Sequence, residues 1–152
     1  VAAEEIDIKE ANPEQVTNDS DIIVTATTSK EPILENKWIN NGTHINAIGA
    51  HSSTTREIDT QTVVNSKIVV DSLETAMKEA GEILIPIAEN KITKKDIYGE
   101  LGEIILNNKS GRKDNEEITL FKSCGLSVQD IATANIIYKR AIEKKVGRNI
   151  EI

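Results

Sequence analysis

Three short runs of aliphatic and β-branched residues recur at nearly equal intervals along this chain. They begin at positions 22, 44 and 67, and they read IIVTA, HINAI and KIVV. Apolar residues at consecutive positions in so short a run are typical of strands buried on both faces, as in parallel sheets. Each interval has room for one strand and for the crossover that parallel neighbours require. The spacing therefore predicts an α/β fold with a mostly parallel sheet.

Weaker local signals predict the remaining elements. They are strands at 6–8 and 118–121, helices that start after Asn12, that run between Ser72 and Gly81 and that cover 96–106, and a polar loop at 107–117. The clearest helix is the last one, for which Ser127 is the expected N-cap with Asp130 three residues later. It carries an apolar stripe at helical spacing, made of Val128, Ile131, Ala134, Tyr138 and Ala141.

Composition narrows the classes of partner. The formal net charge of −7 argues against nucleic acid or an anionic membrane, because both attract basic surfaces. No apolar run approaches the roughly 20 residues of a membrane-spanning helix, and no signal-peptide pattern is present. The single cysteine excludes an internal disulfide and suits a reducing cytoplasm. The two histidines and the cysteine lie too far apart in sequence for a zinc motif, so we expect no metal.

Small and hydroxylic residues follow the predicted strands, where open parallel sheets bind their ligands. The segments are Thr25-Ala26-Thr27-Thr28-Ser29, Ile48-Gly49-Ala50-His51 and Phe121-Lys122-Ser123-Cys124-Gly125. Residues of this kind let a flat or phosphorylated ligand approach the backbone closely. The alternative is that they only terminate strands and form turns.

Seven segments, in order and spacing, carry a resemblance to a known family. They are DIIVTAT (21–27), PIL (32–34), GTHINAIGA (42–50), REID (56–59), EAGE (79–82), ELGE (100–103) and TLFKS (119–123). Together they resemble the C-terminal portion of the ornithine cyclodeaminase/mu-crystallin family. This family includes cyclodeaminases, an archaeal-type alanine dehydrogenase and reductases of cyclic imines (ketimines).

The resemblance implies a partial Rossmann-like, doubly wound sheet that lacks its first βαβ unit and has a long C-terminal helix. Residues 1–125 would form the C-terminal part of an NAD(P)-binding domain. Residues 126–152 would be a helix that packs on a substrate and dimerisation domain absent from this sequence, which leaves its apolar stripe partly exposed. The chain has no Gly-x-Gly-x-x-Gly dinucleotide motif and begins with valine. We therefore expect it to be inactive by itself.

The resemblance also implies a bound NAD or NADP, with the nicotinamide end along the strand ends. Thr27 and Thr28 would line the cofactor, Ile48 would pack on the nicotinamide region, and Ser123 would reach the carboxamide or its surroundings. Each residue has a structural alternative. The two threonines would be loop caps, Ile48 a core residue and Ser123 part of a turn.

His51 occupies the position at which the cyclodeaminases carry an aspartate. An imidazole can accept or donate a proton near neutral pH, but it provides no permanent negative charge for a substrate ammonium group. This departure makes His51 a candidate catalytic residue for hydride chemistry rather than deamination; the alternative is a solvated loop histidine. Glu79 lies at a position that borders the ligand pocket in the crystallin branch, and a surface carboxylate is its alternative.

For the complete protein, the resemblance implies an NAD(P)-dependent oxidoreductase that acts at the Cα of a small amino acid or cyclic imino acid. The type would be an alanine dehydrogenase or a ketimine (pyrroline-carboxylate) reductase, working as a homodimer. Two alternatives remain. One is an ornithine cyclodeaminase, an ammonia-lyase that recycles NAD+; the other is a crystallin-like protein that binds ligand without chemistry.

Overall fold

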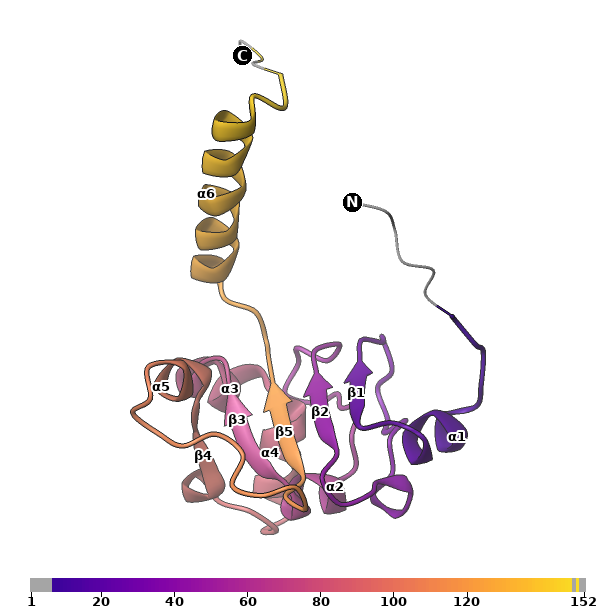
Figure 1. Cartoon of the computed structure of the whole chain (residues 1–152). Coiled ribbons are helices and arrows are strands. Elements are labelled where there is room, and N and C mark those ends of the chain that lie inside the picture. The colour runs from indigo at the N-terminus through magenta and orange to yellow at the C-terminus, as the bar shows by residue number, and fades with distance from the viewer. Residues whose placement is uncertain (1–6, 149, 151–152) are drawn as a thin grey trace.

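A computed structural model describes residues 7–148 and residue 150 (Figure 1). The elements in chain order are α1 (Pro13–Asn18), β1 (Ile22–Thr25), η1 (Asn36–Trp38), β2 (His44–Ala47), α2 (Thr60–Asn65), β3 (Lys67–Val70), α3 (Leu73–Glu79), α4 (Gly81–Ala88), η2 (Lys94–Asp96), β4 (Ile97–Glu100), α5 (Leu101–Ile105), β5 (Thr119–Lys122) and α6 (Ser127–Lys144). The five strands form one parallel sheet in the order β1-β2-β5-β3-β4. The expected parallel α/β sheet with a long C-terminal helix is confirmed.

The last strand lies in the middle of the sheet, because β5 inserts between β2 and β3. The register aligns the final residues of neighbouring strands in one row, in the order Thr25, Ala47, Lys122, Val70 and Glu100. Since all strands are parallel, the segments that follow them emerge at the same edge. This arrangement brings together segments that lie far apart in the sequence.

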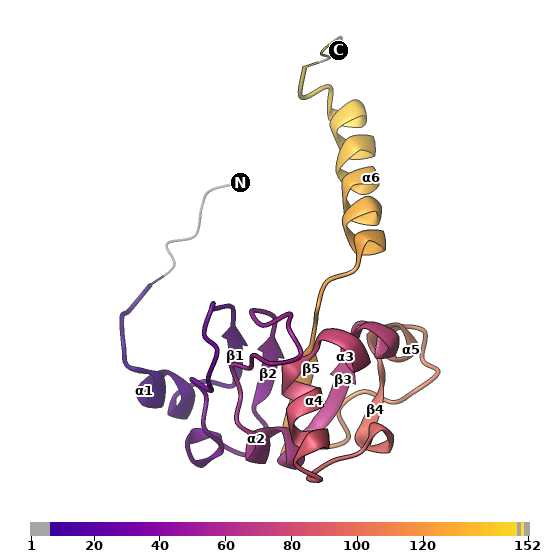
Figure 2. The same cartoon turned by 180° about the vertical axis from the view of Figure 1, so that it is seen from behind.

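One face of the sheet is covered by α2, α3 and α4, which lie behind the sheet in Figure 1 and in front of it in Figure 2. The core forms between this face and the helices, from buried residues such as Ile45, Ile68 and Leu120 on the strands and Val63 and Ile83 on the helices. Burial of these aliphatic side chains stabilises the domain without help from aromatic residues.

The opposite face has no helix layer among the described residues. Ile22 and Val24 of β1 are exposed there. A hollow of about 630 Å³ extends over this face, and His44, Val69 and Phe121 are among the residues that line it. None of the six residues predicted for the site lines this hollow, so this hollow and the predicted site are different places.

The helix predicted over 96–106 is wrong in its first half. Residues 97–100 form β4, in which burial alternates from one residue to the next, and only 101–105 are helical. Pairing with β3 decides this segment, because Gly99 and Glu100 lie opposite Val69 and Val70 in the sheet. The helices α2 and α4 had not been predicted. Neither Asp7 nor Ile8 of the weak strand expected at 6–8 is in a strand, and Ile6 lies outside the described residues.

Helix starts were predicted with mixed success. Asn12 caps α1 through a complete capping box with Gln15, and Ser72 caps α3. Gly81, expected just past the end of α3, instead begins α4. The N-cap of α6 is Leu126, and no side chain caps this helix, so the predicted capping role of Ser127 is wrong.

The helix α6 extends away from the sheet, beyond the carboxyl ends of the strands (Figure 1). The chain leaves β5 through Gly125, whose φ of 87° falls in the left-handed region that glycine adopts without strain. Val128, Ile131 and Tyr138 of the apolar stripe are all exposed. The exposure expected for this stripe is therefore confirmed.

Candidate functional site

The structure gathers most of the predicted site residues at the carboxyl edge of the sheet. Thr27 and Thr28 follow β1, Ile48 and His51 follow β2, and Ser123 follows β5. These strands are neighbours in the sheet, so the three segments emerge side by side. Thr27, Thr28 and His51 are exposed, and Ile48 is 47% exposed, which makes an apolar surface at the end of a strand.

Glu79 is less closely tied to this group. It is exposed at the end of α3, two residues before Gly81. A Cβ added to Gly81 would overlap the carbonyl oxygen of Thr55, so the backbone at the start of α4 packs directly against the loop that carries His51. Glu79 is close in sequence to Gly81, which packs against this loop. It therefore lies on the rim of the site rather than among the strand ends.

Beneath the exposed residues lies a fully buried carboxylate, Glu57. Its Oε2 accepts hydrogen bonds from the Thr25 hydroxyl at 2.8 Å and from the Gly49 amide at 2.9 Å, and its Oε1 accepts one from the Thr27 amide at 2.6 Å. Burial raises the pKa of Glu57, but the hydrogen bonds from Thr27, Thr25 and Gly49 outweigh it and leave the pKa below its ordinary value. Glu57 thus joins the segment after β1 to the segment after β2 as a buried anion.

Gly49 lets these two segments approach each other closely. A Cβ at this position would overlap Oε1 of Glu57 and the backbone of Thr27. The residue must therefore be glycine for steric reasons, even though it does not have a positive φ.

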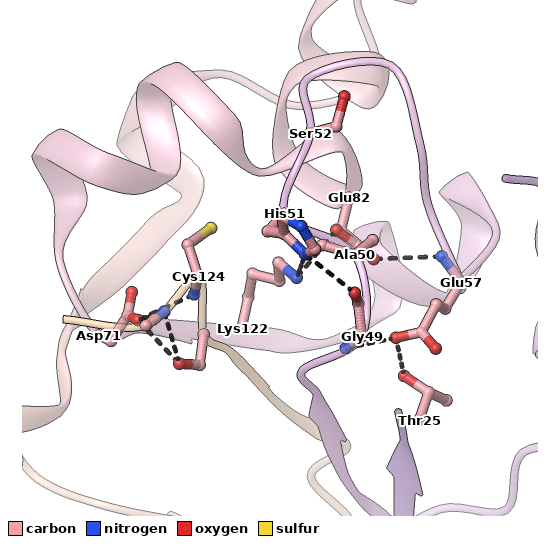
Figure 3. Close-up of polar contacts among 12 residues, drawn as sticks. Thr25, Gly49, Ala50, His51, Ser52, Glu57, Asp71, Glu82, Lys122 and Cys124 are labelled. Atoms are coloured by element: carbon pink, nitrogen blue, oxygen red, sulfur yellow. Dashed lines mark hydrogen bonds and ion pairs between the residues drawn. The ribbon is translucent and has the colours of Figure 1, made fainter. Parts of the chain in front are cut away.

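A buried cation pairs with a second buried carboxylate, Glu82. Lys122, the last residue of β5, is fully buried; its ammonium group donates a hydrogen bond to the Ala50 carbonyl and lies 3.3 Å from Oε2 of Glu82 (Figure 3). That oxygen has no hydrogen bond of good geometry, so the attraction between Lys122 and Glu82 is ionic rather than a directed hydrogen bond. The other oxygen of Glu82 accepts a hydrogen bond from the Glu57 amide at 3.1 Å.

We call Thr25, Gly49, Glu57, Glu82 and Lys122 the strand-end network. Glu57, Glu82 and Lys122 lie within segments that carry the family resemblance, but the sequence reasoning assigned none of them a role. The signal that could have identified them is the occurrence of charged residues beside apolar ones in those segments. Side chains of this kind are almost never fully buried unless paired.

Ser123 is held by a third buried carboxylate, Asp71, which directly follows β3. Oδ2 of Asp71 accepts hydrogen bonds from the Ser123 hydroxyl and from the amides of Cys124 and Gly125, each at 2.8 Å. The Ser123 oxygen also accepts a hydrogen bond from the Gly125 amide at 3.2 Å, so one lone pair of this oxygen is left for a ligand. Asp71 was not singled out from the sequence, although it directly follows a buried strand.

The His51 side chain makes one hydrogen bond within the described residues, between Nδ1 and the Gly49 carbonyl oxygen at 3.3 Å. Its ring is otherwise open to solvent at the carboxyl edge. Cys124 is half-buried, and burial raises the pKa of its thiol to about 11, so it is no thiolate nucleophile at neutral pH. Among the described residues no group of three or more metal-binding side chains occurs, and no helix is long and apolar enough to cross a membrane.

The chain is similar to several proteins of known structure or activity. It is 41% identical to alanine dehydrogenase of Archaeoglobus fulgidus over 91% of this chain and 43% of that protein. Among solved structures, Δ1-pyrroline-2-carboxylate reductase of Thermococcus litoralis, in complex with NADH and L-proline, matches with a TM-score of 0.84 and 46% identity over 90% of this chain and 42% of that one. An archaeal alanine dehydrogenase dimer with bound NAD matches with a TM-score of 0.81 and 39% identity, over 92% of this chain and 43% of that one.

This chain spans less than half the length of those relatives. Residues 2–145 match the sequence model of the ornithine cyclodeaminase/mu-crystallin family. The parallel sheet, the segments gathered at its carboxyl edge and the similarity over nine tenths of the chain agree with one another. The chain belongs to the ornithine cyclodeaminase/mu-crystallin family.

Proposed function

We propose that the complete protein containing this chain is an NAD(P)-dependent oxidoreductase that acts at the Cα of a small amino acid or cyclic imino acid. The observation that carries this proposal is the group of exposed residues Thr27, Thr28, Ile48 and His51 at the carboxyl edge, above the buried strand-end network. The similarity to an alanine dehydrogenase and to a pyrroline-carboxylate reductase supports it.

The residues at this edge fit a nicotinamide cofactor. The half-exposed Ile48 offers an apolar surface on which a flat ring can pack. The Ser123 oxygen, whose proton is directed at Asp71, can accept a hydrogen bond from a carboxamide N–H. The exposed Thr27 and Thr28 bring hydroxyl groups to the same edge. When bound, the cofactor would donate or accept a hydride, and the protein would orient it.

His51 is the candidate proton-transfer residue of this chain. It is exposed at the edge from which Ile48 also projects, and its Nε2 has no described hydrogen-bond partner, so an imidazole nitrogen is available for proton transfer. A neutral histidine lacks the permanent negative charge of a carboxylate, which favours redox chemistry over the cyclodeaminase reaction. Glu79, on the rim, is proposed to border the substrate. A homodimer is the proposed assembly, as in the archaeal alanine dehydrogenase structure.

The decisive experiment uses the complete gene product. It is given L-alanine with NAD+ or NADP+, and Δ1-pyrroline-2-carboxylate with NADH or NADPH, while nicotinamide absorbance is followed. Stoichiometric oxidation or reduction of the cofactor with either substrate would support the proposal. A parallel reaction with L-ornithine and limiting NAD+ follows ammonia as well. Ammonia far in excess of the NAD+ supplied, without net NADH, would mean a cyclodeaminase and would overturn it.

The variant His51→Ala tests the residue assignment. We expect turnover to fall by roughly 10²–10⁴-fold, the usual weight of a general acid–base residue, with little change in the affinity for NADH. Unchanged turnover would remove His51 from the mechanism.

A further inference from the structure

We propose that Lys122 is a positioning residue, whose buried ammonium group holds the loop of residues 48–56 in the place from which Ile48 and His51 face the cofactor. We call this segment the His51 loop. The position of this loop depends on contacts within this chain alone, whereas its link to the cofactor rests on the proposed function.

The location of Lys122 requires a reason. It is fully buried, in the row of strand ends between Ala47 and Val70, on the face that the helices cover. Removing an ammonium group from water is unfavourable unless it is paired and hydrogen-bonded. A buried ion pair is also often replaceable by apolar side chains without loss of stability. Stability alone therefore does not explain a lysine here, whereas its hydrogen bond to Ala50 is something that no apolar side chain can make.

The contacts of the His51 loop show why that hydrogen bond matters. Within residues 50–55, the other described hydrogen bonds are internal, such as those from Thr54 to the Ser52 hydroxyl and from Thr55 to the Ser52 carbonyl, or join the His51 ring to the adjacent Gly49 carbonyl. The two ends of the loop are held separately, since the Ile48 amide donates to Thr25 and the Arg56 amide to Lys30. The bond from Lys122 to the Ala50 carbonyl is the described hydrogen bond that joins this stretch to the sheet. Ala50 immediately precedes His51, so the position of the histidine backbone depends on Lys122.

The same cation is coupled to the other half of the site. Glu82 pairs with Lys122 through Oε2 and accepts the Glu57 amide through Oε1. The Glu57 carboxylate in turn holds Thr27 and Gly49. Through this network, the cofactor-facing residues after β1 and after β2 share one rigid support.

The test variant is the double substitution Lys122→Met/Glu82→Gln in the complete protein. It removes both buried charges together, keeps side chains of similar size, and keeps a glutamine oxygen for the Glu57 amide. We therefore expect it to fold, with a melting temperature lowered by several degrees because the buried Ala50 carbonyl loses its donor. The matched control is Lys67→Met/Glu117→Gln. Lys67 begins β3 at the opposite edge, also donates to a backbone carbonyl, that of Gly111, and pairs with Glu117 at 3.5 Å.

Two measurements decide the proposal. Hydrogen exchange is measured at the amides of Gly49, Thr54 and Thr55, which donate hydrogen bonds in the wild-type loop. NADH affinity and kcat/KM are measured on the same samples. In the double variant we expect exchange about tenfold faster or more at these amides, since hydrogen bonds from charged donors are among the stronger ones. We expect a comparable loss of NADH affinity and kcat/KM, and none of these effects in the control.

Unchanged exchange in the loop would overturn the positioning role of Lys122. Faster exchange with unchanged NADH affinity and kcat/KM would overturn its link to the cofactor. If the wild-type protein neither binds NADH nor turns over substrate, the proposed function fails. The exchange measurement would then still decide whether Lys122 positions the loop.

Discussion

Glu57 offers the sharpest test of the buried site, through the substitution Glu57→Gln. Glutamine has nearly the same shape but exchanges one acceptor oxygen for an NH2 group, which can only donate. In the best orientation the remaining oxygen faces the Thr27 amide, and the Thr25 hydroxyl turns to accept from the new NH2 group. The Gly49 amide then faces another donor and loses its partner.

The expected loss of stability follows from these contacts. An unsatisfied buried amide costs about 1–3 kcal/mol, and the remaining hydrogen bonds lose the strength that a charged acceptor gives them. We therefore expect Glu57→Gln to lower the free energy of unfolding by about 2–4 kcal/mol. For a domain of this size that corresponds to a fall in Tm of roughly 4–16 °C. The assay is thermal unfolding followed by circular dichroism, with the exposed Glu31→Gln as the control that leaves Tm unchanged.

The pH dependence adds a second criterion. The pKa of Glu57 in the folded protein lies below its ordinary value of 4.5, so the unfolded chain takes up the proton first as the pH falls. The stability that the carboxylate contributes is complete above about pH 4.5 and is lost as the pH falls through the folded-state pKa. The difference in Tm between wild type and Glu57→Gln should thus be largest near neutrality and shrink below pH 4.5. A difference that is absent at pH 7, or that is constant down to pH 3, would refute this account.

Three further predictions concern neighbouring residues. Gly49→Ala should destabilise the protein by about 2 kcal/mol or more in urea unfolding, because the new Cβ would overlap Glu57; a loss below about 0.5 kcal/mol would contradict the close approach. Asp71→Asn should speed hydrogen exchange at the amides of Cys124 and Gly125, which both donate to the Asp71 carboxylate; equal rates would show that another contact holds this turn. Cys124, with a pKa of about 11, should react with iodoacetamide at pH 8 far more slowly than a free cysteine and accelerate up to about pH 11; fast alkylation at pH 8 would exclude its burial.

Local pattern sufficed for the strands that make the site. The short apolar runs predicted β1, β2, β3 and β5, because β-branched and aliphatic residues favour strands. Burial on both faces, which these runs also predicted, is wrong for β1, whose Ile22 and Val24 are exposed on the face without helices. Local pattern also sufficed for the N-caps of α1 and α3, since capping depends on residues three positions apart. The position of Thr27, Thr28, Ile48, His51 and Ser123 just after these strands followed directly from the strand prediction.

Local pattern failed where a distant partner decides the conformation. The segment 97–100 has apolar residues compatible with a helix, yet it pairs with β3 and becomes a strand. The buried network was missed for the same reason. Its members come from positions 25, 49, 57, 82 and 122, and no spacing within the sequence relates them.

The sequence by itself therefore determined the class of fold, the family and the edge of the sheet at which we propose that ligands bind, because periodicity and ordered segments are properties of the chain read in order. Only the tertiary structure decided which charged residues are buried and what they hold. The physical reason is the insertion of β5 between β2 and β3, which places Lys122 against Ala50 and Glu82. A lysine in a strand is ordinarily solvated, and its burial follows from strand order, which is set by the packing of the whole domain.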